Sequence, residues 1–176
     1  MALLTILKYP DPRLHEIAAR VSQCDDQIRQ LINDMAETMY AAPGVGLAAT
    51  QVDVHRRIIV IDISETRDQP RVFVNPELIV AEGEADCEEG CLSVPGVFEK
   101  IRRAQRVTVQ AQDADGRSFT LEASGLLAVC IQHEMDHLEG KVFVEKLSRL
   151  KQSRLLARFR KQGRRTAEPE RARLVL

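Results

Sequence analysis

The sequence predicts a single α+β domain. Three observations carry this prediction: two helical segments, a β-hairpin before the second of them, and no internal repeat or linker within 176 residues. The composition, 44% hydrophobic and 29% charged, is typical of a globular protein and excludes a collagen-like, low-complexity or wholly disordered chain. A formal net charge of −1 gives the whole chain no attraction to nucleic acid or to an anionic membrane.

The first helix is predicted from Asp25 to Tyr40, because five apolar residues recur on one face at helical spacing. The stretch AAPG at 41–44 ends it. A β-branched run at 57–64 predicts a buried strand. Segments 71–74 and 78–80 predict two strands, separated by an Asn-Pro pair that interrupts the pattern.

The clearest β signal is a hairpin. Apolar residues alternate with polar ones over 107–111 and 119–123, and the Asp-Ala-Asp-Gly turn lies between them. The next element is too long and continuous for a strand and predicts a helix over about 125–139. Ser124 is placed at its N-cap and Gly140 just beyond its end.

No apolar run approaches the roughly 18 residues needed to span a bilayer, and the first ten residues lack the basic start of a signal peptide. We therefore expect a cytoplasmic protein without membrane contact. Four cysteines, at 24, 87, 91 and 130, are too few for a disulfide scaffold. In a reducing compartment a cysteine more often lies in the core, binds a metal or acts in catalysis.

The helix over 125–139 carries HEMDH at 133–137, an HExxH motif. His133 and His137 are one turn apart on the same face, so their imidazoles can hold one divalent metal. Glu134 is offset by about 100° and can reach a metal-bound water. The motif predicts that this water is the nucleophile and that Glu134 is the general base that takes its proton.

A catalytic metal site needs a third protein ligand. Downstream, Glu139 faces away and Glu145 is a weak candidate, so the search extends upstream. Two segments there are unusual: GVGLAATQ at 44–51 and EGCLS at 89–93. Taken singly, the first is explained by a tight turn and the second by a buried structural cysteine. The remaining histidines, His15 and His55, lie in polar surroundings and are expected to be solvated.

Together, GVGLAATQ, EGCLS and QHEMDH resemble in order and spacing the three signature motifs of the peptide deformylase family. The resemblance extends over about residues 3–165, including YPDPRL at 9–14, and is strongest to the bacterial type with a long C-terminal helix. It implies antiparallel β-sheets packed around the central motif helix, within one catalytic domain at 1–165. That domain includes a basic helix at about 148–165, and 166–176 is expected to be a flexible tail.

By this resemblance Cys91 is the third metal ligand, beside His133 and His137, and the expected metal is Fe²⁺, with Ni²⁺ or Zn²⁺ as substitutes. A thiolate next to a divalent cation is deprotonated at neutral pH, which suits this assignment. The implied reaction removes the N-formyl group from the initiator methionine of newly synthesised polypeptides and releases formate. The Gln51 side chain and the Leu92 backbone N–H would form the oxyanion hole.

The resemblance also implies substrate contacts. Gly46 would approach the substrate backbone closely, where a side chain would intrude. Asp136 and Arg103 are a candidate ion pair supporting the site. The candidate substrate-binding residues, most of which would line an apolar pocket for the methionine side chain, are Val45, Gly46, Cys87, Glu89, Leu126, Val129 and Cys130.

Two other classes of protein stay open. An HExxH peptidase would cut peptide bonds with Glu145 or another carboxylate as third ligand, and it would not need Cys91 or Gln51. A non-catalytic metal-binding or regulatory protein would be favoured if Glu134 or Gln51 were replaced, but both are present.

Charge is unevenly distributed along the chain. Segment 149–165 contains eight basic residues and no acidic one, so the rest of the chain carries a net charge of −9. We expect a helix whose Leu155, Leu156 and Phe159 pack on the body. The resemblance implies that its basic face contacts the ribosome beside the exit tunnel, where RNA is anionic. No sequence-specific nucleic-acid binding is expected.

Overall fold

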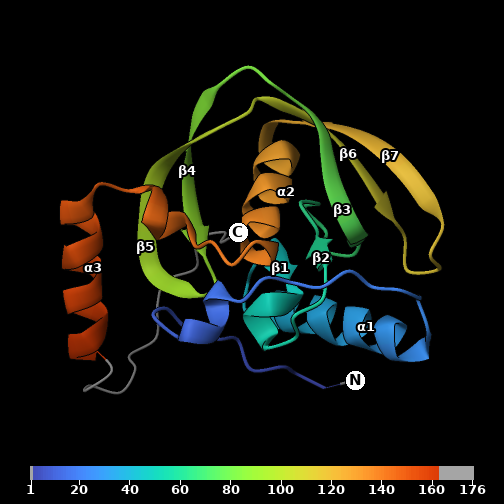
Figure 1. Cartoon of the computed structure of the whole chain (residues 1–176), viewed down its shortest axis with the longest axis horizontal. Coiled ribbons are helices and arrows are strands. Elements are labelled where there is room, and N and C mark those ends of the chain that lie inside the picture. The colour runs from blue at the N-terminus through green and yellow to red at the C-terminus, as the bar shows by residue number, and fades with distance from the viewer. Residues whose placement is uncertain (1, 163–176) are drawn as a thin grey trace.

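The structure is a computed structural model that describes residues 2–162. Over this range it confirms the α+β prediction, with two antiparallel sheets and three α-helices (Figure 1). The predicted tail at 166–176 and the last residues of the predicted C-terminal helix lie outside the described residues.

Helix α2 (Gly125–Leu138) occupies the centre of the fold, and the strands arch over it (Figure 1). The larger sheet has the strand order β1-β2-β3-β6-β7, and β4 pairs with β5 in a separate two-stranded sheet. The strand bounds are β1 Gly46–Ala48, β2 Ile58–Ile61, β3 Arg71–Glu82, β4 Ala85–Cys91, β5 Val94–Arg103, β6 Arg106–Gln112 and β7 Ser118–Ser124.

Strand β2 is buried on both faces, which explains its continuous β-branched run. Ile59 and Ile61 belong to the apolar cluster around α2, whereas Ile58 and Val60 belong to the cluster against α1. The strand is shorter than the predicted segment 57–64. Pairing with β1 and β3 ends at Ile61, since the chain then enters a loop.

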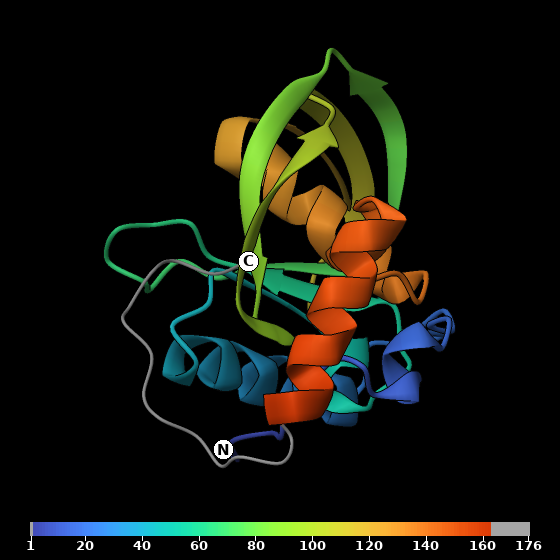
Figure 2. The same ribbon diagram turned by 90° about the vertical axis from the view of Figure 1, so that its left-hand side faces the viewer.

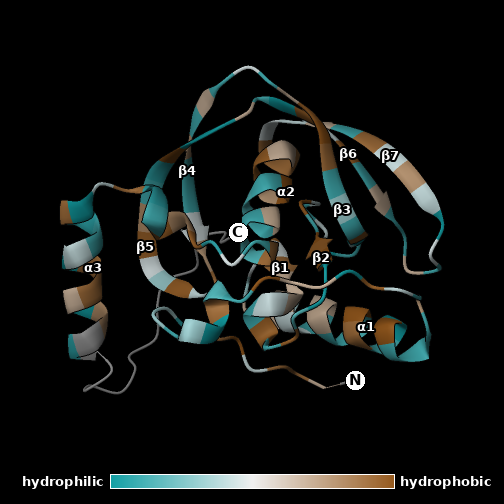
Figure 3. Ribbon diagram, in the orientation of Figure 1, coloured by the Kyte–Doolittle hydropathy of each residue, from teal (hydrophilic) through white to brown (hydrophobic). Residues whose placement is uncertain are grey.

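Helix α1 (Asp26–Ala41) confirms the first helical prediction within one residue. Asp25 is the N-cap, and its carboxylate accepts a hydrogen bond from the Ile28 N–H at 3.0 Å. Met35 and Met39 are fully buried against β1 and β2. The alternation of apolar and polar residues along α1 is visible in Figure 3.

The prediction of two strands at 71–74 and 78–80 is wrong, since both segments belong to the single strand β3. Asn75 adopts a positive φ of 51°, and the register with β6 shifts between Val74 and Glu77. Such a bulge accommodates Pro76, which cannot donate to the ladder. The Asn75 amide also exchanges two 2.8 Å hydrogen bonds with the backbone of Val21, so pairing resumes beyond the bulge.

The hairpin and the central helix agree with the sequence. Strands β6 and β7 pair in one unbroken register, with Val109 opposite Leu121. Helix α2 ends at Leu138, and Gly140 follows with φ +67°. A Cβ at Gly140 would lie 2.4 Å from the His15 carbonyl oxygen, so this stop requires glycine.

Helix α3 (Arg149–Gln162) packs beside β5, as Figures 1 and 2 show from two directions. Its residues Leu155, Leu156 and Phe159 pack against a third apolar cluster, as predicted. The rings of Phe159 and Tyr9 meet edge to face, with their centroids 6.1 Å apart. Within residues 2–162, no helix is both long enough and apolar enough to cross a membrane.

Candidate metal centre

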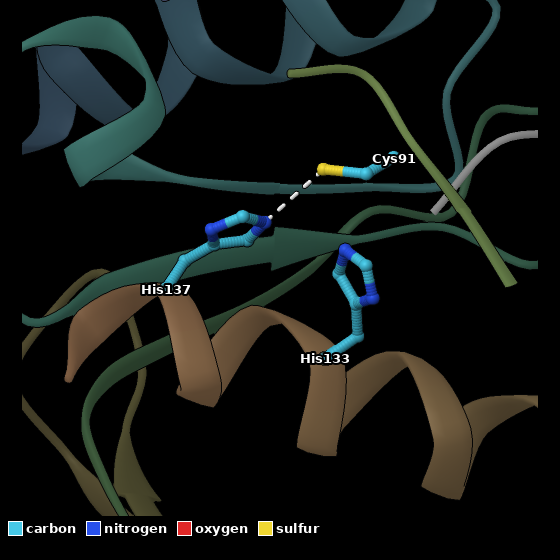
Figure 4. A group of neighbouring side chains, drawn as sticks. All are labelled: Cys91, His133 and His137. Atoms are coloured by element: carbon cyan, nitrogen blue, oxygen red, sulfur yellow. Dashed lines mark hydrogen bonds between the residues drawn. The ribbon is translucent and has the colours of Figure 1, made fainter. Parts of the chain in front are cut away.

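Side chains from two distant parts of the sequence meet at the central helix, which itself carries two of them (Figure 4). One ligand atom each from Cys91, His133 and His137 lies within 4.8 Å of the others. The Cys91 Sγ is 3.2 Å from Nε2 of His137, and all three side chains are buried. One sulfur and two imidazole nitrogens form a donor set that suits iron, nickel or zinc.

The fold explains this convergence. Helix α2 presents His133 and His137 one turn apart, with ring centroids 5.0 Å from each other. Cys91 is the last residue of β4, where the chain turns into β5. The Thr50 hydroxyl donates to the His137 carbonyl at 3.1 Å and ties the glycine-rich motif to the end of α2.

His133 is oriented by a buried carboxylate. Its Nδ1 lies 2.9 Å from Oε2 of Glu89, so Nδ1 carries the proton and Nε2 presents a lone pair. Nε2 is buried without a hydrogen-bond partner among the described groups. A buried imidazole nitrogen left in this way fits a metal ligand.

Glu89 is itself held by Arg103. The guanidinium donates to both carboxylate oxygens, from Nε at 2.6 Å and from Nη2 at 2.9 Å. Its remaining Nη1 donates to Asp136 at 2.6 Å, which confirms the expected Arg103–Asp136 ion pair. Burial alone would raise the pKa of Glu89, but the hydrogen bonds from Arg103 and His133 outweigh it and lower the pKa to about 2.

Burial also sets the protonation of Cys91 and His137, two of the candidate ligands. It raises the pKa of the Cys91 thiol to about 12, with Glu134 adding to the effect and the Ser93 N–H and Lys8 opposing it. A thiolate at this position therefore needs a nearby cation. Burial lowers the pKa of His137 well below its ordinary value, with His133 and Arg103 contributing, so its imidazole is neutral and able to ligate.

Glu134 is fully buried, and neither of its carboxylate oxygens has a hydrogen-bond partner among the described groups. Burial, followed by the charge of Glu89, raises the pKa of Glu134 well above its ordinary value. Its carboxylate fills the space beside Gly46, where a Cβ would lie 2.4 Å from Oε1. An unpartnered carboxylate in a buried site is a candidate for proton transfer.

Gln51 is fixed at both ends of its amide. Its Oε1 accepts from the Ala48 N–H at 2.8 Å, and its Nε2 donates to the Ser93 hydroxyl at 3.1 Å. Nε2 is also 3.5 Å from the Cys91 sulfur, so the amide N–H₂ group faces the candidate metal ligands. Leu92, the other predicted oxyanion donor, is buried directly after Cys91.

Most candidate pocket residues lie near one another. Val45, Val129 and Cys130 are buried in the apolar cluster around α2, and Cys87 packs against it. Leu126 is 47% exposed at the start of α2. Their contact with substrate stays a prediction, as does that of Glu89, whose carboxylate faces His133 and Arg103.

Sequence reasoning missed Ser93 and Lys8. Ser93 bonds Gln51 and donates its backbone N–H to the Cys91 sulfur at 3.4 Å; its place in EGCLS was the available signal. Lys8 donates to the Leu92 carbonyl at 2.5 Å, and its only signal was adjacency to YPDPRL. His15 and His55 bond the carbonyls of Gly140 and Arg13 instead of joining the site, and all four cysteines are free.

Comparison with known proteins gives a consistent result. The model of the family described as polypeptide deformylase matches residues 3–153. Peptide deformylase 2 of Nitrosomonas europaea is 66% identical over 165 residues, covering 94% of this chain and 89% of that protein. The peptide deformylase of Chromobacterium violaceum is 60% identical over 162 residues, covering 92% of this chain and 97% of that protein.

Solved structures share the fold. The peptide deformylase of Legionella pneumophila superimposes with a TM-score of 0.87 at 47% identity, covering 94% of this chain and 100% of that one. The peptide deformylase of Ehrlichia chaffeensis in complex with actinonin gives a TM-score of 0.89 at 41% identity, covering 93% and 99%. The family match spans most of the chain, and these relatives share its architecture. The chain therefore belongs to the polypeptide deformylase family of enzymes.

Proposed function

We propose that this enzyme removes the N-formyl group from the N-terminal formyl-methionine of newly synthesised polypeptides and releases formate. The observation that carries the proposal is the buried trio Cys91, His133 and His137, with the unpartnered Glu134 carboxylate beside it. Family membership supports the choice of a formyl amide over an internal peptide bond.

The trio would hold one divalent ion, and we assign Fe²⁺ to it, with Ni²⁺ or Zn²⁺ as substitutes. Such an ion supplies Lewis acidity and lowers the pKa of water toward neutrality. The Cys91 thiol loses its proton when the ion binds, whereas both histidines bind as neutral imidazoles. The contact of Glu89 with Nδ1 of His133 would leave the Nε2 lone pair free to bind the ion.

Glu134 would handle the proton. Its carboxylate takes a proton from the attacking water and later delivers it to the nitrogen of the leaving amine. Its raised pKa, caused mainly by burial, suits both halves of that transfer, because the group must hold the proton between the two steps.

The developing negative charge on the formyl oxygen needs donors that are already in place. The Gln51 amide fits this role, since its oxygen is tied to Ala48 and its Nε2 faces the ligands. We assign the backbone N–H of Leu92 as the second donor. Fixed donors of this kind stabilise a transition state without reorganisation.

The methionine side chain would enter the apolar region formed by Val45, Cys87, Val129 and Cys130, with Leu126 at its rim. The absence of a side chain at Gly46 keeps the Glu134 carboxylate next to this region. An apolar pocket selects for the methionine side chain by burying it.

The decisive experiment compares two products from one sample. Metal-loaded protein, prepared anaerobically, is incubated with a formyl-Met tripeptide, and both formate and internal cleavage fragments are measured. Formate without fragments supports the proposal, and Glu134→Gln serves as the inactive control. Fragments without formate would instead support the HExxH peptidase alternative.

Actinonin provides a second test, because the Ehrlichia chaffeensis relative was crystallised with it. We propose that it binds this chain at the Cys91–His133–His137 trio and that this binding requires the metal. A ligand present at 100 times its Kd stabilises the folded state by about 2.7 kcal/mol, so a clear rise in Tm is expected only for metal-loaded protein. An equal rise in metal-stripped protein would contradict binding at the trio.

The basic face of α3 is proposed to contact ribosomal RNA, which would place the reaction in the cytoplasm where new chains emerge. Arg149, Arg154 and Lys161 are exposed, while the apolar face packs on β5. Reversing these three charges to glutamate keeps that packing and should weaken salt-sensitive ribosome binding without changing turnover of free peptides. Undiminished binding would refute the contact.

A further inference from the structure

The segment 7–9, which precedes a short 3₁₀ helix at Pro12–His15, is bonded to residues of the site. The Leu7 N–H donates to the Gln51 carbonyl and the Tyr9 N–H to the Ser93 carbonyl, each at 2.8 Å. The side chains of Leu7 and Tyr9 are buried in the third apolar cluster. Lys8, between them, is an exposed residue, and its ammonium Nζ reaches the Leu92 carbonyl oxygen at 2.5 Å.

That carbonyl belongs to the peptide group whose N–H is on Ser93. The same N–H points at the Cys91 sulfur, with 3.4 Å between nitrogen and sulfur. The hydrogen bonds therefore run in series, from the Lys8 ammonium through the Leu92–Ser93 peptide to Sγ. A cation on the oxygen of a peptide polarises its N–H, so each bond in such a chain strengthens the next.

Ser93, whose N–H belongs to this peptide, also positions Gln51. The Ser93 hydroxyl accepts from the Gln51 amide, and the Ser93 carbonyl accepts from Tyr9. Movement of the Leu92–Ser93 peptide would therefore displace both the sulfur and the proposed oxyanion donor. Lys8 is a tether to this peptide from outside the three sequence motifs.

We propose that Lys8 is a positioning residue of the metal centre, which polarises the Leu92–Ser93 peptide and so strengthens the N–H hydrogen bond to the Cys91 sulfur. A stronger hydrogen bond withdraws electron density from the thiolate and makes a metal bound there a better Lewis acid. The expected effect of Lys8 on kcat rests on the proposed deformylation. The expected effect of Lys8 on the electron density of the Cys91 sulfur does not.

Cobalt-substituted protein tests the inference, because the sulfur-to-Co²⁺ charge-transfer band reports the electron density on Cys91. Lys8→Met keeps the aliphatic stem and removes the charge, Lys8→Arg keeps the charge, and Lys141→Met is a control on an exposed lysine beyond α2. We expect the band of Lys8→Met to move to lower energy and that of Lys141→Met to stay unchanged. In Lys8→Arg, which keeps the charge, the band should lie close to its energy in the parent protein.

Kinetics supply the second readout. Lys8→Met should lower kcat roughly tenfold with little change in KM, since the polarised peptide acts on charge that develops in the transition state. A lower Tm with an unchanged band and unchanged kcat would overturn the proposal and leave Lys8 a merely structural tether. If Lys8→Met folds poorly, Lys8→Gln is measured in its place against the same criteria.

A failed deformylation assay remains distinguishable from a failed inference. The charge-transfer band requires metal but no substrate, so its shift supports the role of Lys8 even for an enzyme with another substrate. An unshifted band in both Lys8→Met and Lys8→Gln overturns it even if formate is released.

Discussion

Oε2 of Glu89 lies 2.9 Å from Nδ1 of His133, and both side chains are buried. The contact fixes the tautomer of a predicted metal ligand, and Arg103 holds the carboxylate from the opposite side. The strand β4 thus supplies both the Cys91 thiol, which is predicted to bind the metal, and the Glu89 carboxylate, which orients His133.

Glu89→Gln should weaken metal binding about 10–100-fold, because His133 loses its anionic partner. It should also destabilise the fold by about 1–3 kcal/mol, since the buried Arg103 loses one of its two anionic partners and keeps only Asp136. Chelator competition and urea unfolding measure the two effects. Glu82→Gln is the control: its pair with Arg106 is exposed, so a change below about 1 kcal/mol is expected. Unaltered metal affinity in Glu89→Gln would contradict the role of this contact.

Glu134→Gln should reduce turnover about 10²–10⁴-fold while the metal content stays the same. The folded state raises the pKa of this carboxyl mainly through burial, so ionisation above the ordinary value near 4.5 disfavours folding. The amide removes that penalty. We therefore expect the Tm of metal-free Glu134→Gln to equal or exceed that of the parent at pH 7, with a difference that vanishes near pH 4. Near-normal turnover would remove Glu134 from the proton transfer.

Gly46→Ala should lower kcat, because the new Cβ would lie 2.4 Å from Oε1 of Glu134 and must displace that carboxylate. A misplacement of about 1 Å in a catalytic group can reduce the rate on the order of 10²-fold. Gly116→Ala is the control: φ is +79°, and the added Cβ meets Cys24 only at 3.6 Å. That variant should lose stability without losing kcat, so equal kcat losses in both would argue against a specific clash with Glu134.

Gln51→Ala should lower kcat about 10²–10³-fold, as expected for loss of one oxyanion donor. Steady-state kinetics on the formyl-Met tripeptide measure the effect. Gln30→Ala is the control. Gln30 lies on the exposed side of α1, where its amide donates to Asp34, so its replacement should leave kcat unchanged. A parental kcat in Gln51→Ala would remove this residue from the oxyanion hole.

Asp62→Asn tests the loop that follows β2. The buried Asp62 carboxylate accepts from the Tyr40 hydroxyl at 2.6 Å and from the backbone N–H groups of Ser64 and Gln69 at 2.8 and 2.9 Å. Burial alone would raise its pKa, but these hydrogen bonds outweigh it and lower the pKa. The substitution should cost about 1–3 kcal/mol at pH 7.

The pH dependence of that loss follows from the lowered pKa of Asp62. Its stabilising contribution is complete above the unfolded value of about 3.9 and is lost as the pH falls through the lower folded value. Unfolding curves of the parent and of Asp62→Asn should therefore converge below about pH 4. A constant gap between them at all pH values would show that the ionised carboxylate is not what stabilises the loop.

The elements that the sequence predicts well carry local signals. Helix α1 has an apolar face and an Asp25 cap, the hairpin has strict alternation around a turn, and Gly140 follows the end of α2 at Leu138. Strands β4 and β5 were missed because they are largely polar on their exposed faces. Strand β3 was divided in two because only pairing with β6 shows that the chain continues past Asn75.

By itself the sequence determined the spacing of His133 and His137, the position of Glu134 between them and the basic charge of α3. The spacing is informative because residues four apart in a helix lie on the same face. The motif resemblance predicted Cys91 beside the two histidines, and the tertiary structure brings the three together. Tertiary structure alone decided that Glu89 faces His133 and that Lys8 reaches the carbonyl of Leu92. These contacts span 44 to 84 residues of sequence, and no local periodicity encodes them. They form only when the β4–β5 turn and the N-terminal segment pack around α2 and its histidines.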